Sequence, residues 1–191
     1  GGEDLLVVEL GARRLVGPRC AFRAHQFALS GSWQCHFGET GPEIWRDSLG
    51  AVEVFVDFVG SSGSFTGVSR YLKTQDSSIR CYVVEPSTSA PLSGGLIEDP
   101  AHPIQGGGYS RSAADLPFYD PDLPHGYLQV TGTEAIDTAR LLAQTEGIFA
   151  GFSTGANVAA AIQLLRGEEQ GACVVALACD FGLKYLATDL Y

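Results

Sequence analysis

The sequence predicts an α/β protein with a mostly parallel sheet and helices on both faces. Apolar, strand-like runs alternate with helical segments along the chain, which is the pattern of parallel strands joined by crossover helices. One such run passes directly into a glycine- and serine-rich turn that opens a helix, in VEVFVDFVGSSGSFTGVSRYLK. With 45% apolar residues and no polar low-complexity tract, the 191 residues can also bury a sizeable core.

The first predicted elements are short. GGEDLLVVELGARRLVG predicts a helix that stops at Gly11 and a short strand over about residues 12–16. After a polar, irregular stretch, TGPEIWRDSL predicts a helix capped by Thr40, with Pro42 in its first turn and its end near Gly50.

The middle of the chain carries the strongest strand signals. A strand is predicted over residues 51–60, a helix over 64–73, and a β-branched strand over 79–86. Residues 86–126 are rich in Pro, Gly, Ser and Asp, so they predict a long ordered loop region, which is often functional.

The last third repeats the alternation. An amphipathic helix is predicted over residues 131–147, where Gly147 stops it. IFAG then predicts a strand, followed by a small-residue turn and a helix beginning near Ser153. ACVVALACD, residues 172–180, predicts a last buried strand.

Composition excludes several classes of partner. A formal charge of −10 argues against a nucleic-acid surface, because phosphate backbones are held mainly by Lys and Arg. No apolar run approaches the length of a membrane span and the first residues lack a secretory layout, so we expect a cytoplasmic protein without membrane contact. Five cysteines without a C-x-x-C pair predict reduced thiols.

The chain contains no methionine and begins with two glycines. As written it cannot be an unprocessed translation product. We therefore expect a fragment or a processed piece of a longer protein.

The GSSGS turn, residues 60–64, is the strongest candidate binding site. Backbone N–H groups at a helix N-terminus face an anion, and the helix dipole favours negative charge there. Gly60 and Gly63 permit a tight backbone, and the hydroxyls of Ser61 and Ser64 add donors. The alternative is a glycine-rich turn that binds nothing, because the spacing is not that of a nucleotide-binding motif.

Two other motifs have simpler explanations. GFSTG imitates the nucleophile elbow, but a Ser153 that caps the following helix accounts for it better. His25, Cys35 and His36 do not have zinc-ligand spacing, so we expect no metal.

Seven segments, taken in order, make the sequence resemble the cysteine synthases. These enzymes, the O-acetylserine sulfhydrylases, belong with cystathionine β-synthase to the fold-type-II enzymes that depend on pyridoxal 5′-phosphate. The resemblance runs from about residue 3 to the end, on HQF (25–27), TGPEIW (40–45), VGSSGSFTGVSRYLK (59–73), VEPSTSAPLSGG (84–95), HPIQGGG (102–108), EGIFAGFSTGANVAAA (146–161) and CDFGLKYLATDLY (179–191).

The resemblance implies a role for the loop and for the substrate site. The loop formed by Gly60, Ser61, Ser62, Gly63 and Ser64 would hold the cofactor phosphate, as its counterpart does in the family. Ser62 stands where the family usually has glycine, and its Cβ could obstruct the approach of the phosphate. Gln26 would contact the substrate carboxylate, and Gly106 would lie beside cofactor and substrate.

The partner of the pyridine nitrogen is left open between two residues. Asp180 or Phe181 stands where close relatives place a small hydroxyl residue. A carboxylate there would keep the ring nitrogen protonated, whereas a phenyl ring cannot make the bond.

A catalytic lysine is expected to be absent. In the family the cofactor forms a Schiff base with a lysine of an asparagine-lysine motif that lies upstream of everything matched here. Lys73 and Lys184, the two lysines of this chain, do not resemble it. The sequence therefore predicts no catalytic residue within this chain.

The resemblance implies the following overall expectations. Residues 1–28 would end a smaller domain and residues 29–191 would form most of a larger one. The activity would be formation of cysteine from O-acetylserine, or a similar amino acid, and sulfide or another thiol, in a homo-oligomer that is a dimer by family. This chain would be inactive alone, and the alternative is a degenerate, non-catalytic relative that binds a ligand or a partner.

Overall fold

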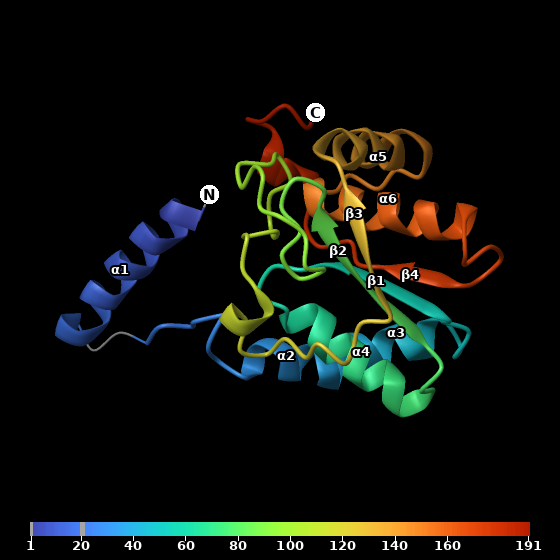
Figure 1. The fold of residues 1–191 in the computed structure, drawn as a ribbon, viewed down its shortest axis with the longest axis horizontal. Coiled ribbons are helices and arrows are strands. Elements are labelled where there is room, and N and C mark those ends of the chain that lie inside the picture. Colours follow the sequence, from blue (N-terminus) through green and yellow to red (C-terminus); the bar gives the residue numbers. More distant parts are fainter. Residues whose placement is uncertain (1, 20–21) are drawn as a thin grey trace.

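Four parallel strands form the central sheet, in the order β3-β2-β1-β4 (Figure 1). The computed structural model describes residues 2–19 and 22–191. Its strands are β1 Val54–Phe58, β2 Arg80–Pro86, β3 Gly126–Val130 and β4 Val174–Ala176.

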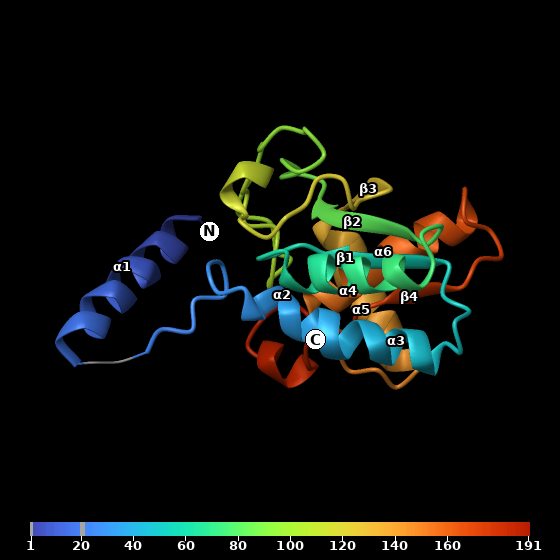
Figure 2. The ribbon, with the colours of Figure 1, turned by 90° about the horizontal axis from the view of Figure 1, so that it is seen from below.

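Helices cover both faces of this sheet. Figures 1 and 2 show α2, α3 and α4 on one face and α5 and α6 on the other. The bounds are α2 Gly31–Cys35, α3 Gly41–Asp47, α4 Gly63–Gln75, α5 Gly132–Thr145 and α6 Phe152–Arg166. The predicted α/β class with a parallel sheet is confirmed.

Strand β1 lies between β2 and β4 in the sheet, and both of its faces are buried. Val54, Val56 and Phe58 pack in the cluster under α5 and α6, and Phe55 packs in the cluster that contains α4 residues. A parallel sheet covered on both faces needs such continuous apolar strands. Asp57, only 1% exposed in the same strand, is therefore an anomaly.

The N-terminal prediction is wrong. The structure has one helix, α1 Gly2–Arg19, in place of a helix stop at Gly11 and a strand over residues 12–16. A glycine inside a helix costs about 1 kcal/mol, which does not end a helix flanked by good helix formers. Helix α1 stands apart from the sheet in both views (Figures 1 and 2).

Thr40 does not cap a helix. A five-residue π-helical turn, His36–Thr40, joins α2 to α3, and Thr40 has helical dihedrals. The Gly41 N–H bonds the His36 carbonyl, and the following Pro42 has no N–H to donate. The stretch before Thr40 is therefore irregular over residues 22–30, as predicted, but helical from Gly31 onward.

Strand predictions failed at the rim of the sheet. The edge strand β3 lies just beyond the predicted loop and was not predicted, since only five residues with alternating burial signal it. The predicted strand at residues 148–151 is reduced to an isolated bridge between Ala150 and Phe181. The last strand forms, but it is shorter than residues 172–180.

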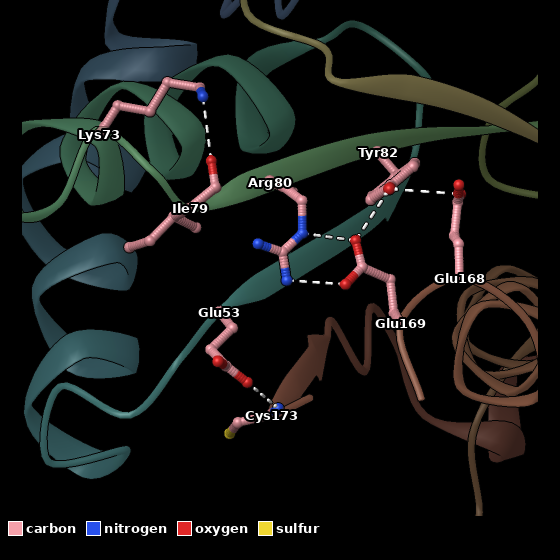
Figure 3. A network of polar contacts seen from close by, with 8 residues as sticks. All are labelled: Glu53, Lys73, Ile79, Arg80, Tyr82, Glu168, Glu169 and Cys173. Carbon is pink, nitrogen blue, oxygen red and sulfur yellow. Dashed lines mark hydrogen bonds and ion pairs between the residues drawn. The ribbon is translucent and has the colours of Figure 1, made fainter. Parts of the chain in front are cut away.

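A set of paired polar side chains closes the edge where the strands begin (Figure 3). The Arg80 guanidinium donates to both carboxylate oxygens of Glu169, at 2.5 and 2.7 Å, and the Tyr82 hydroxyl donates to Oε1 at 2.9 Å. Glu53 accepts the Cys173 N–H at 2.9 Å. We call these five residues the amino-edge network.

The described helices give no candidate for a membrane span, since none of them combines the necessary length with sufficient hydropathy.

Candidate functional site

A cavity of about 340 Å³ lies at the opposite edge, where β1 and β4 end. This volume falls in the range of small-molecule pockets. We call it the carboxyl-edge cavity, and in open parallel sheets this edge is where ligands bind. Its polar lining comes from separate segments and includes Gln26, Asp57, Ser61, Ser64, Ser153 and Asp180.

The GSSGS loop connects β1 to α4 and forms one wall. Gly60, Ser61 and Ser64 line the cavity, and Gly63 begins α4. A Cβ on Gly60 would lie 3.0 Å from the Gly106 carbonyl oxygen, a tight contact that glycine avoids. The wall therefore combines a helix N-terminus with two serine hydroxyls.

Ser62 lies in the loop but does not line the cavity. Its φ of 69° is left-handed, which favours glycine, and its side chain is buried with no hydrogen-bond partner for Oγ among the described residues. Ser62 is not among the residues that line the cavity, and the obstruction of the phosphate stays a prediction. The cost of Ser62 is backbone strain, on the order of 1 kcal/mol.

Asp57 and Ser64 face each other in the cavity. The Ser64 hydroxyl donates to Asp57 Oδ2 at 2.6 Å. Burial raises the pKa of Asp57 to about 7, although hydrogen bonds from Ser64, Asn157 and the Phe58 backbone lower it. Asp57 thus exchanges a proton near neutral pH.

The segment after β4 supplies the opposite wall. Asp180 Oδ2 accepts from the Tyr185 hydroxyl at 2.5 Å and from Lys184 Nζ at 3.1 Å. Asp180 Oδ1 is buried and has no partner within the described part of the chain. Asp180 therefore lines this wall while its second carboxylate oxygen is packed against Gly151.

Of the two candidates for the ring-nitrogen position, only Asp180 lines the cavity. Phe181 is 59% exposed and packs edge-on against Phe149. The geometry favours Asp180 as the residue that can reach a ligand.

The substrate-site predictions fall in the same cavity. Gln26, in the segment before α2, and Gly106, in the long loop, both line it. Gly106 has a φ of +103°, which a side chain rarely adopts. Of the nine predicted residues, Ser62, Gly63 and Phe181 do not line it.

Several lining residues were not predicted from the sequence, above all Asp57. A carboxylate within the apolar run VFVDFV is itself a signal, because Asp is almost never buried without a function or a partner. His36 and Tyr109 also line the cavity, and only the tertiary structure brings them there.

Ser153 does not cap α6. The N-cap is Gly151, no side-chain cap bond forms, and Ser153 lies in the first turn and lines the cavity. The residue that imitates a nucleophile elbow is thus part of the cavity wall.

The two lysines lie at opposite edges of the sheet. Lys73 Nζ donates to the Ile79 carbonyl at 3.0 Å, beside the amino-edge network (Figure 3). Lys184 lines the cavity, with its amine held by Asp180. Only Lys184 could meet a ligand of the cavity.

Comparison with known proteins identifies relatives along nearly the whole chain. A protein-family model described as pyridoxal-phosphate dependent enzyme matches residues 2–180. Cysteine synthase 3 of Caenorhabditis elegans is 39% identical over 185 residues, which are 96% of this chain and 52% of that protein. The chain spans about half the length of the curated relatives it matches.

Solved structures agree with the sequence relatives. The crystal structure of O-ureido-L-serine synthase matches with a TM-score of 0.87 at 33% identity, over 95% of this chain and 56% of that one. The cysteine synthase of Entamoeba histolytica matches with a TM-score of 0.85 at 31% identity, over 97% of this chain and 53% of that one. The fold and the sequence therefore point to the same group of enzymes.

Proposed function

This chain belongs to the cysteine synthase family of pyridoxal-phosphate-dependent enzymes, and on that premise we propose that the carboxyl-edge cavity binds pyridoxal 5′-phosphate. The observation that carries the proposal is the GSSGS loop, which presents Ser61, Ser64 and the N-terminus of α4 to the cavity. Charge-assisted donors of this kind suit a phosphate.

The dimensions of the cavity and the carboxylate of Asp180 fit the cofactor. A volume of about 340 Å³ accommodates a small aromatic phosphate ester. Asp180 lines the cavity, and its carboxylate would face the ring nitrogen and keep it protonated. When bound, pyridoxal phosphate supplies an electron sink for negative charge that develops on the substrate.

Gln26 and Gly106 are proposed to lie beside the substrate. Both residues line the cavity, and in the sequence Gln26 precedes the GSSGS loop and Gly106 follows it. The amide of Gln26 can donate two hydrogen bonds to a substrate carboxylate. Because Gly106 has no side chain, it leaves space for that carboxylate. Amino acids with a leaving group, such as O-acetylserine, and sulfide or another thiol are the proposed substrates of the whole protein.

This chain by itself is proposed to bind the cofactor without catalysing the replacement. A lysine that attacks the cofactor aldehyde must present a neutral amine. Lys73 lies at the wrong edge of the sheet, and the Lys184 amine is engaged by the carboxylate of Asp180 at 3.1 Å.

The alternative is a non-catalytic relative that keeps the fold as a binding module. Two departures in and beside the loop favour it, the buried carboxylate of Asp57 and the strained Ser62. This alternative predicts that the purified chain does not bind the cofactor at all.

The test is a titration of the purified chain with pyridoxal 5′-phosphate, followed by absorption before and after borohydride reduction. We expect saturable binding and no reduced adduct at a single lysine in peptide mass spectra. Ser64→Ala should weaken binding roughly tenfold, since a hydrogen bond to a charged group is lost. Ser78→Ala is the matched control, because that serine is exposed and bonds Asp76.

Two outcomes would contradict the proposal. An adduct confined to Lys184 would show that this chain carries its own Schiff-base lysine. Binding that Ser64→Ala and Ser78→Ala weaken equally would place the phosphate elsewhere.

A further inference from the structure

Asp57 is a buried acid at the end of a strand whose other residues are apolar. It is 1% exposed, lines the carboxyl-edge cavity, and accepts the hydrogen of Ser64, a residue of the GSSGS loop. A serine hydroxyl has one hydrogen to donate. While the ionised Asp57 holds that hydrogen, Ser64 cannot donate to an anion in the cavity.

Titratable groups face Asp57 across the cavity from several elements. The segment after β4 contributes Cys179, Asp180 and Lys184. The π-helical turn between α2 and α3 contributes His36, and the long loop contributes Tyr109. The α4 and α6 helices contribute the neutral Ser64 and Asn157.

These groups leave the charge of Asp57 uncompensated. The only lysine of the cavity lining bonds Asp180. Burial lowers the pKa of His36, with Glu39 opposing that shift, so this imidazole is neutral near pH 7. Within the described residues no cation is paired with Asp57.

A proton on Asp57 reverses the situation. Neutral Asp57 can donate to the Ser64 oxygen or to Asn157 Oδ1, which is buried and has no partner in the described chain. The Ser64 hydrogen can then turn to the cavity. Neutralisation also removes the repulsion between a buried carboxylate and an anion, which is strong where water is excluded.

We propose that Asp57 is a positioning residue that must carry a proton, donated toward Ser64, before the GSSGS loop accepts a phosphate. The proposal rests on the function proposed above and deepens it. It makes anion binding take up a proton, which moves from solvent to the Asp57 carboxylate without any other change in bonding.

The pH window follows from the pKa of Asp57, which burial raises to about 7. If only the neutral form binds, affinity is constant below that pH and falls about tenfold per pH unit above it. Affinity should therefore fall roughly tenfold between about pH 6 and about pH 8.

The experiment is calorimetric titration of the purified chain with pyridoxal 5′-phosphate and with inorganic phosphate across this pH range. Using two buffers of different ionisation enthalpy measures proton uptake directly. For the unmodified chain at about pH 8, we expect Asp57 to take up about one proton for each ligand bound. At about pH 6 Asp57 already carries this proton, so it should contribute no uptake. This readout needs no variant.

Asp57→Asn provides the decisive comparison. The amide keeps the shape and donates to Ser64 at every pH, so its affinity should lack the tenfold loss and exceed that of the unmodified chain at about pH 8. Because the ligand ionises identically in both titrations, the ratio of the two affinities cancels its contribution. Glu169→Gln is the matched control, because it removes a carboxylate at the far edge of the sheet and should retain the loss with pH.

The outcomes separate this proposal from the function on which it rests. Binding whose pH profile is the same in the unmodified chain and in Asp57→Asn, or binding without proton uptake, would overturn the role of Asp57 alone. No binding of either ligand at any pH would overturn the phosphate site and with it this proposal.

Discussion

Each of the two edges of the sheet holds a nearly buried carboxylate, but among the described residues only the carboxylate at the amino edge is paired with a cation. At the amino edge, Glu169 is 7% exposed and accepts hydrogen bonds from Arg80 and Tyr82. At the carboxyl edge, Asp57 has no cationic partner in the described chain, and its neighbour Asn157 leaves Oδ1 unpaired.

The difference teaches where the chain is built for stability and where it is built for a ligand. Paired groups lower the free energy of the folded state, whereas unpaired buried groups raise it and persist where something else uses them. Of the five buried side-chain atoms without a partner in the described chain, one belongs to Asp180, which lines this cavity, and one to Asn157, which hydrogen-bonds Asp57.

The largest expected effect is an opposite pH dependence at the two edges. Because the folded-state pKa of Asp57 is raised from 3.8 to about 7, its contribution to stability is full below about pH 4 and is lost as the pH rises through about 7. The shift corresponds to roughly 4 kcal/mol. Urea unfolding at a series of pH values should show this loss in the unmodified chain and not in Asp57→Asn.

Glu169 provides the control for that series. Its pKa is lowered, first by the hydrogen bond from Arg80, so its contribution is present at neutral pH and is lost as the pH falls through the folded-state pKa. Glu169→Gln should flatten the acid side of the curve and leave the loss toward pH 7 in place. A curve for Asp57→Asn that matches the unmodified chain would break the comparison.

The next effect concerns the paired edge itself. Arg80→Met should destabilise the chain by about 2 to 3 kcal/mol, since it leaves Glu169 without its cation; the partial exposure of Arg80 reduces the cost below that of a fully buried pair. Thermal unfolding measures the loss. Phosphate binding, at the far edge, should not change.

A double-mutant cycle sharpens this second prediction. Combining Arg80→Met with Glu169→Gln should recover part of the loss, because the uncompensated charge disappears. Strict additivity of the two single changes would show that the pair contributes no coupling energy.

The smallest effect is at Ser62. Ser62→Gly should stabilise the chain by about 1 kcal/mol, because it relieves the left-handed strain and removes an unpartnered hydroxyl. Ser62→Ala, which keeps the Cβ, should recover only the part that comes from the hydroxyl. A loss of stability in Ser62→Gly would mean that Ser62 makes a contact which the folded chain needs.

Sequence patterns predicted the centre of the fold better than its rim. Strands β1 and β2 and helices α4 and α5 follow from apolar runs, helical periodicity and a glycine stop, signals that are local to each segment. The helix through Thr40 and the short strand β3 were missed. Strand β3 forms by pairing with β2, a tertiary neighbour that its own five residues do not reveal.

The candidate site divides in the same way. Six residues predicted from motifs contribute to one cavity: Gly60, Ser61, Ser64, Gln26, Gly106 and Asp180. Ser62, Gly63 and Phe181, which the same motifs included, lie outside its lining. A motif identifies a segment, but the direction of each side chain depends on backbone dihedrals that the segment alone does not reveal.

The sequence by itself determined the α/β class, the family and the segment that begins α4, because alternating apolar periods and a glycine-rich turn act over a few residues. Only the tertiary structure decided that Asp57 meets Ser64 and that Arg80 meets Glu169, 89 residues along the chain. Such pairs depend on the tertiary fold, which raises the pKa of Asp57 by burial and lowers that of Glu169 by the hydrogen bond from Arg80.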